Sequence, residues 1–165
     1  MLQGIQAHAK LNTMSLVTAD SLMSIEDALH LAKLSGREII KRNVTVTGKI
    51  LTGTIDEIHL APKEITIIDD KNGLKAYQSY INQVLAYRLA LEEQFDPHLT
   101  IHAAIRSTNT GNVIWEKPFL LEEDGQRITD LAIRIQGIID ETIKPKVHRS
   151  PNKCRSCRFA GYCRL

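Results

Sequence analysis

The sequence predicts an α/β or α+β fold in which helices flank a mixed central sheet. Segments with helical periodicity alternate with β-rich segments, in the order helix, strands, helix, hairpin, helix. The length of 165 residues and the 43% apolar content suit one domain with a substantial core. A cysteine-rich tail follows the last helix. We therefore expect one domain over residues 1–147 and a tail, 148–165, packed on it.

The first half of the chain predicts one helix followed by paired strands. Ser24–Leu34 opens with a serine and two acidic residues and places its apolar residues on one stripe, and Gly36 supplies the stop. From Val44 to Leu60 the chain is rich in valine, isoleucine and threonine and is interrupted by Gly48 and Gly53, a pattern that predicts strands separated by turns. After a turn at Ala61–Lys63, Glu64–Asp70 predicts the partner strand.

The second half predicts a long helix, a hairpin and a final helix. Ala76–Phe95 is rich in helix formers and repeats its apolar residues at three and four positions. Leu99–Ser107 and Val113–Leu120 flank the turn signature Asn109–Asn112, which predicts an antiparallel hairpin. An isoleucine-rich stripe over Ile128–Ile143 predicts a last helix that ends before a proline.

Basic residues are concentrated at the end of the chain. The formal charge is only +2, but after Glu141 there are seven basic residues and no acidic one. A solvated tail is the plain interpretation, and a surface facing nucleic-acid phosphates is the functional one. Neither a membrane-spanning run nor the layout of a signal peptide occurs. We expect a cytoplasmic protein.

The three cysteines, Cys154, Cys157 and Cys163, lie within ten residues at a C-x2-C-x5-C spacing. Thiolates two residues apart can turn onto one metal ion or cluster. An odd number of cysteines rules out complete internal disulfide pairing, and a reducing compartment also favours metal over disulfides. The tail is therefore predicted to bind metal.

An acidic and lysine pattern suggests a second metal site. Glu64–Asp70 is an apolar strand that ends in charge, and its period of two places Asp69 and Lys71 on one face. If Asp56 converges on Asp69 from the neighbouring strand, the two carboxylates suit Mg²⁺ or Mn²⁺, and Lys71 lies beside the metal-bound water. Taken alone, the Asp-x-Lys triplet is more often a polar turn between a strand and a helix.

Three further residues are weak signals individually. Gln83 and Tyr87 are four apart and share a helical face with Tyr80. The alternative to a functional role is that the two tyrosines are half-buried packing residues and that Gln83 lies at the surface. His8 is a lone histidine near the start of the chain, and such a residue is more often unremarkable than a ligand.

Taken in order, these motifs resemble the RecB-like branch of the PD-(D/E)XK nucleases, and the cysteine tail makes them most similar to the CRISPR-associated Cas-four exonucleases. The motifs extend over nearly the whole chain: Gly4-x3-His8, Gly53-x2-Asp56, Asp69-x-Lys71, Gln83-x3-Tyr87 and Cys154-x2-Cys157-x5-Cys163. The resemblance implies a restriction-endonuclease-like fold with a mixed central sheet flanked by helices.

The resemblance also implies roles for individual residues. His8, Asp56 and Asp69 would bind Mg²⁺ or Mn²⁺, and Lys71 would be the catalytic lysine. Gln83 and Tyr87 would form the motif on the active-site helix that helps to hold the lysine or the DNA strand. Three ligands of a four-iron, four-sulfur cluster would come from the tail: Cys154, Cys157 and Cys163.

The chain departs from the family pattern at two points. The family's remaining cysteine lies in a helix ahead of the histidine motif, and here only seven residues precede His8. We expect a start that lacks this helix; the alternatives are another cluster ligand such as His148, or a zinc site of three cysteines and His148. The second departure is Asp70, where the family usually has an apolar residue, and alternation predicts that it faces away from the metal.

The expected function is that of a metal-dependent exonuclease on single-stranded DNA, acting in CRISPR adaptation beside the integrase complex. One alternative is a RecB-like nuclease of recombination, repair or phage origin. Another, from a different class, is a non-cleaving cysteine-metal module that binds DNA. The sequence does not predict cleavage polarity or oligomeric state.

Overall fold

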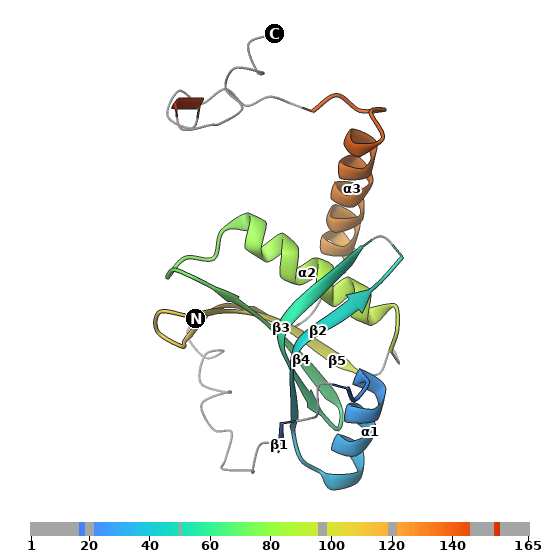
Figure 1. Cartoon of the computed structure of the whole chain (residues 1–165), viewed down its shortest axis with the longest axis vertical. Coiled ribbons are helices and arrows are strands. Elements are labelled where there is room, and N and C mark those ends of the chain that lie inside the picture. Colours follow the sequence, from blue (N-terminus) through green and yellow to red (C-terminus); the bar gives the residue numbers. More distant parts are fainter. Residues whose placement is uncertain are drawn as a thin grey trace. The chain divides into compact units, whose positions relative to one another are not determined.

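A mixed six-stranded sheet organises the chain (Figure 1). The computed structural model describes residues 17–18, 22–49, 51–95, 99–118, 122–145 and 154–155. Along the sheet the strands follow chain order, from β1 to β6. Their bounds are β1 Val17–Thr18, β2 Ile39–Thr47, β3 Thr52–Ala61, β4 Glu64–Lys71, β5 Thr100–Ser107 and β6 Val113–Lys117.

Both strand orientations occur, which confirms the predicted mixed sheet. β2, β3 and β4 form an antiparallel meander, and β5 and β6 form the predicted antiparallel hairpin. β4 and β5 are parallel. A parallel pair needs a crossover connection, and α2, Gln78–Glu92, provides it.

α1, Ile25–Ser35, has the predicted signals at both ends. The Ser24 hydroxyl accepts a hydrogen bond of 3.0 Å from the Asp27 N–H, and Gly36 ends the helix with a left-handed φ of 65°. Ala28, Leu29 and Ala32 are buried, and the helix packs on β2 and β3. α2 packs on the strands from β2 to β5.

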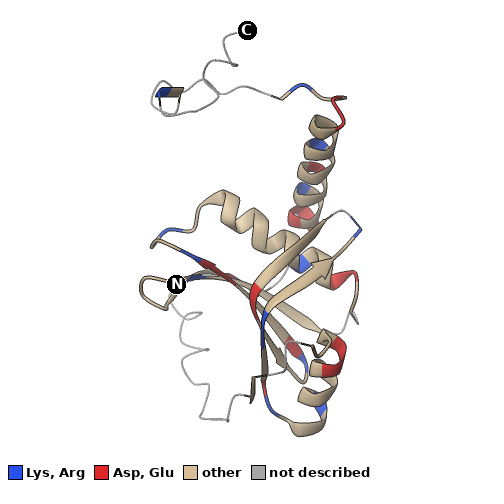
Figure 2. Ribbon diagram, in the orientation of Figure 1, with Lys and Arg blue, Asp and Glu red and all other residues tan. Residues whose placement is uncertain are grey.

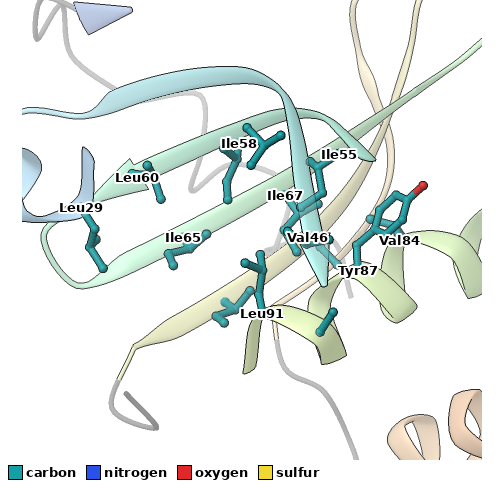
Figure 3. Close-up of a cluster of buried hydrophobic side chains, with 14 of the residues drawn as sticks. Leu29, Val46, Ile55, Ile58, Leu60, Ile65, Ile67, Val84, Tyr87 and Leu91 are labelled. Carbon is teal, nitrogen blue, oxygen red and sulfur yellow. The ribbon is translucent and has the colours of Figure 1, made fainter. Parts of the chain in front are cut away.

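The core gathers aliphatic side chains from the strands and from these two helices (Figure 3). Ile58, Leu60, Ile65 and Ile67 are fully buried, and Leu85 and Leu91 of α2 are buried as well. Tyr87 lies at the edge of this cluster with its hydroxyl oxygen pointing away from the aliphatic groups (Figure 3). The Tyr87 hydroxyl therefore lies at the margin of the aliphatic core.

Strand β2 begins earlier than predicted. The sequence Lys41-Arg42-Asn43 interrupts the apolar pattern, so only the part from Val44 was predicted as strand. In the structure the strand starts at Ile39 and continues through Asn43, whose φ of 53° lies in the left-handed region. The alternation of buried side chains shifts by one residue at this point, which is why a strict period of two missed it.

The chain divides into two compact units, Met1–Thr129 and Asp130–Leu165. α3, Glu122–Ile139, begins in the first unit and ends in the second. In the second unit, the Ile143 N–H donates to the Gly137 carbonyl at 2.9 Å after a turn at Glu141, whose φ is 60°. Our sequence-based domain boundary, 1–147 and 148–165, stays a prediction.

No helix in the described ranges combines the length and the apolar character needed to cross a membrane.

Candidate active site

The end of β4 carries the first two site residues. Asp69 is only 1% exposed, and its Oδ2 lies 2.8 Å from the Nζ of Lys71. Alternation along the strand places both side chains on one face, as the sequence predicts. The Lys71 Nζ also lies 5.3 Å from the centre of the Tyr80 ring, within the range of a cation–π contact. A carboxylate and an aromatic ring from two elements thus hold the ammonium group.

Asp56 joins Asp69 from the neighbouring strand. β3 and β4 are antiparallel with Glu57 opposite Ile68, so Asp56 and Asp69 are adjacent across the ladder. The Asp56 Oδ2 accepts a hydrogen bond of 2.8 Å from the backbone N–H of Asp70. Burial raises the pKa of Asp69, and the nearby negative charge of Asp56 raises it further. The two carboxylates converge, as the hypothesis of a shared metal site requires.

The Asp69 carboxylate is raised in pKa chiefly because it is buried, and the nearby Asp56 adds to this effect. Lys71 acts in the opposite direction through a hydrogen bond and its positive charge. The buried Oδ2 has the Lys71 ammonium group as its ion-pair partner at 2.8 Å and no other donor among the described residues. The atom can therefore accept a further positively charged partner.

Such a donor set fits a hard divalent cation. Mg²⁺ and Mn²⁺ prefer one or two carboxylates together with water and substrate phosphate, and they do not need a cage made only of protein. Asp56 and Asp69 would hold the ion. No group of three or more His, Cys, Asp or Glu side chains suited to metal occurs in the described part of the chain. The third predicted ligand, His8, lies outside the described residues.

Gln83 and Tyr87 form a pair on α2, as their spacing predicts. The Gln83 amide donates to the Tyr87 hydroxyl at 2.8 Å. The Tyr87 ring packs on Gly53 of β3 so closely that a Cβ there would lie 2.4 Å from the ring. The Gly53-x2-Asp56 motif therefore has a packing reason, because only glycine lets α2 seat Tyr87 on the strand that carries Asp56.

Sequence reasoning undervalued Tyr80 and missed Arg106. Tyr80 shares a face of α2 with Gln83 and Tyr87, and it is the Tyr80 ring that contacts the Lys71 ammonium group. Arg106 lies on β5 beside Asp70 in the sheet and binds its carboxylate. No motif identifies this arginine from the sequence, because the pairing depends on which strand becomes the neighbour of β4.

The cysteine tail that is predicted to bind metal lies mostly beyond the described residues. Cys154 is exposed and its thiol is free, whereas Cys157, Cys163 and His148 lie outside the described ranges. The predicted cluster and its zinc alternative therefore stay predictions.

An open cavity of about 450 Å³ borders the site. Its lining includes Asp56 and polar residues of four neighbouring strands, β2 to β5: Arg42, Asn43, Glu57, Asp70 and Arg106. Both signs of charge occur on the strands of the sheet (Figure 2).

Comparison with known proteins gives one family assignment. The model of the PD-(D/E)XK nuclease superfamily matches residues 8–164. A solved structure described as the crystal structure of SSO0001 shares 14% sequence identity, with a TM-score of 0.38. The match covers 76% of this chain and 59% of that chain, so it spans less than two thirds of SSO0001. No curated protein matches the sequence.

Proposed function

The chain belongs to the PD-(D/E)XK nuclease superfamily, and from this premise we propose that it is a metal-dependent exonuclease acting on single-stranded DNA. The observation that carries the proposal is the convergence of Asp56, from the middle of β3, with Asp69 and Lys71 at the end of β4. Two carboxylates and a lysine at one point supply the functional groups that phosphodiester hydrolysis needs.

Each residue has a distinct part in the proposed reaction. Asp56 and Asp69 would hold Mg²⁺ or Mn²⁺, which would supply neutralisation of phosphoryl charge and a lowered pKa of water at the site. Lys71, fixed between Asp69 and Tyr80, orients the attacking water and offsets the negative charge that develops on the phosphate. The water oxygen forms the new bond to phosphorus as the bond to the leaving oxygen breaks; the water gives its proton to solvent, and the leaving oxygen takes up a proton from solvent.

Gln83 and Tyr87 support this arrangement from α2. The contact of the Tyr87 ring with Gly53 seats the helix on β3, and the Gln83 amide holds the Tyr87 hydroxyl within the helix. α2 also carries Tyr80, so this packing determines where the ring meets the lysine.

The proposal extends to the cysteine tail and to the biological setting. We propose that Cys154, Cys157 and Cys163 ligate a four-iron, four-sulfur cluster and that the basic residues around them guide DNA toward the site. The setting is prespacer trimming in CRISPR adaptation, beside the integrase complex. The support is the cysteine spacing and the excess of basic residues after Glu141. Counting iron and zinc in anaerobically purified protein separates an iron-sulfur cluster from zinc.

The test of the proposed function compares Lys71→Ala with Lys75→Ala on end-labelled single-stranded DNA in Mn²⁺. The control is matched, because the Lys75 Nζ lies 5.6 Å from the centre of the Tyr77 ring, much as Lys71 lies over Tyr80. We expect Lys71→Ala to lose shortened products and Lys75→Ala to retain them. Equal cleavage by both variants would contradict the role of Lys71.

A further inference from the structure

The residues that follow the two metal-binding candidates are held by one guanidinium group. Glu57 follows Asp56 on β3 and Asp70 follows Asp69 on β4, and the side chains of Glu57 and Asp70 line one cavity together with Arg106. Arg106 of β5 lies beside Asp70 in the parallel register. Its Nε donates to the Asp70 Oδ1 at 2.7 Å, and its Nη2 donates to the Oδ2 at 2.8 Å. This is a bidentate pair.

A third donor of the same guanidinium reaches the other strand. The Arg106 Nη1 donates to the Glu57 Oε1 at 2.7 Å. Glu57 is only 3% exposed and is also bonded to Arg42 at 2.9 Å and to His59 at 3.0 Å. Arg106 therefore bridges β3 and β4, and we call the group of Arg106, Asp70 and Glu57 the arginine clamp.

The arginine clamp matters for Asp56 because the regular alternation of a strand does not determine where the Asp56 side chain points. Buried Ile55 and Ile58 are three residues apart, yet both belong to the same core cluster, so the alternation shifts between them. On the partner strand β2, Asn43 has a left-handed φ of 53° and lies between the residues paired with Glu57 and Ile55. At this break, the hydrogen bond from the Asp70 N–H fixes the Asp56 carboxylate, and the clamp holds the residue that donates it.

We propose that Arg106 is a positioning residue of the metal site. By joining Asp70 to Glu57, it holds β3 and β4 in the offset that lets Asp56 and Asp69 bind one cation. This inference rests on the proposed function, because it concerns the same pair of carboxylates. Arg106 acts through its two acidic partners, Asp70 and Glu57.

The experiment measures Mn²⁺ affinity by titration calorimetry without DNA. The variants are Arg106→Gln and Arg106→Lys, and the control is Arg42→Gln. Arg42 bonds to the same Glu57, but it has no bond to Asp70 among the described contacts, and its side chain is 70% exposed. Loss of residues that orient metal ligands typically weakens metal affinity by roughly 10- to 100-fold, and we expect this for both Arg106 variants. Lysine fails because it cannot form the bidentate pair.

A structural role alone would give a different result. It would lower the midpoint of chemical unfolding of the Arg106 variants while leaving the Mn²⁺ affinity of the folded protein unchanged, and that outcome overturns the inference. If the Arg106 variants do not fold, Asp70→Asn replaces them, because it weakens the bidentate pair and keeps the residue's size. We expect weaker Mn²⁺ binding by Asp70→Asn, and wild-type affinity would overturn the inference.

Asp69→Ala separates failure of the inference from failure of the proposed function. If the wild type and Asp69→Ala bind Mn²⁺ equally, the inference and the proposed function both fail, because the carboxylate pair is not a metal site. If Asp69→Ala loses the binding but the clamp variants retain it, only the positioning role of Arg106 fails.

Discussion

At Asp69, folding and the proposed metal binding make opposite demands on one side chain. Burial and the nearby Asp56 raise its pKa, so ionised Asp69 opposes folding when no cation is present. The raised pKa means that the folded state binds its proton more tightly than the unfolded state. This contribution therefore favours folding at low pH and is lost as the pH rises above the ordinary aspartate pKa of 3.8. Such an arrangement suits a site built to receive a divalent ion.

Asp69→Asn should consequently raise the free energy of unfolding at neutral pH in the presence of EDTA, because the amide carries no charge to bury. Added Mn²⁺ should stabilise the wild type, by about 2.7 kcal/mol at a concentration 100 times its Kd. The variant should gain little. Chemical unfolding with and without Mn²⁺ measures both effects. Equal stabilisation of the two proteins by Mn²⁺ would place the ion elsewhere.

Glu57 shows the reverse behaviour. Its hydrogen bonds to Arg106, His59 and Arg42 outweigh the effect of burial and lower the pKa from 4.5 to about 2. The unfolded state therefore binds the proton more tightly, and the stabilising effect is complete above pH 4.5 and lost as the pH falls toward 2.

Glu57→Gln should cost about 3 kcal/mol of unfolding free energy at neutral pH, the equivalent of this shift in pKa. Urea unfolding across the acid range measures the difference between the variant and the wild type. That difference should shrink steadily below pH 4.5. A difference that does not change with pH would show that the loss comes from packing and not from the charge.

At the scale of elements, the seating of α2 on β3 determines the geometry of the site. Tyr87 packs on Gly53, while Tyr80 of the same helix contacts Lys71 of β4. Displacing the helix would therefore disturb both strands that carry the site.

Gly53→Ala should destabilise the protein by about 1–3 kcal/mol, because the new methyl group meets the Tyr87 ring. Cleavage should fall as well, since Tyr80 moves with the helix. The double variant Gly53→Ala with Tyr87→Ala serves as the control, because it removes the ring that the methyl group meets. In a double-mutant cycle by urea unfolding, the combined cost should be smaller than the sum of the two single costs. Additive costs would mean that the methyl group and the ring do not meet.

The sequence predicted the elements well wherever local chemistry determines them. Ser24 and Gly36 bound α1 as their capping preferences indicate, and the alternation in β4 correctly placed Asp69 beside Lys71. The sequence-based prediction missed β1, which has only two residues, and the early start of β2, where Asn43 breaks the alternation. Arg106 escaped prediction because its role depends on β5 lying beside β4, a contact between distant parts of the chain.

At the scale of the whole molecule, the family assignment and the site agree. The superfamily model extends over residues 8–164, and the described site lies within that range. The charge cluster on β3, β4 and β5 links the two candidate ligand strands to a third strand. The proposed nuclease site therefore lies in the sheet itself and does not depend on a single loop.

The most direct measurement is degradation of end-labelled single-stranded DNA in Mn²⁺ by the wild type, by Asp69→Ala and by Asp140→Ala, an exposed aspartate of the second unit. We predict progressive shortening by the wild type and by Asp140→Ala, none by Asp69→Ala, and none by any of the three in EDTA. Cleavage by Asp69→Ala at the wild-type rate, or cleavage that persists in EDTA, would contradict a metal-dependent site at Asp56 and Asp69.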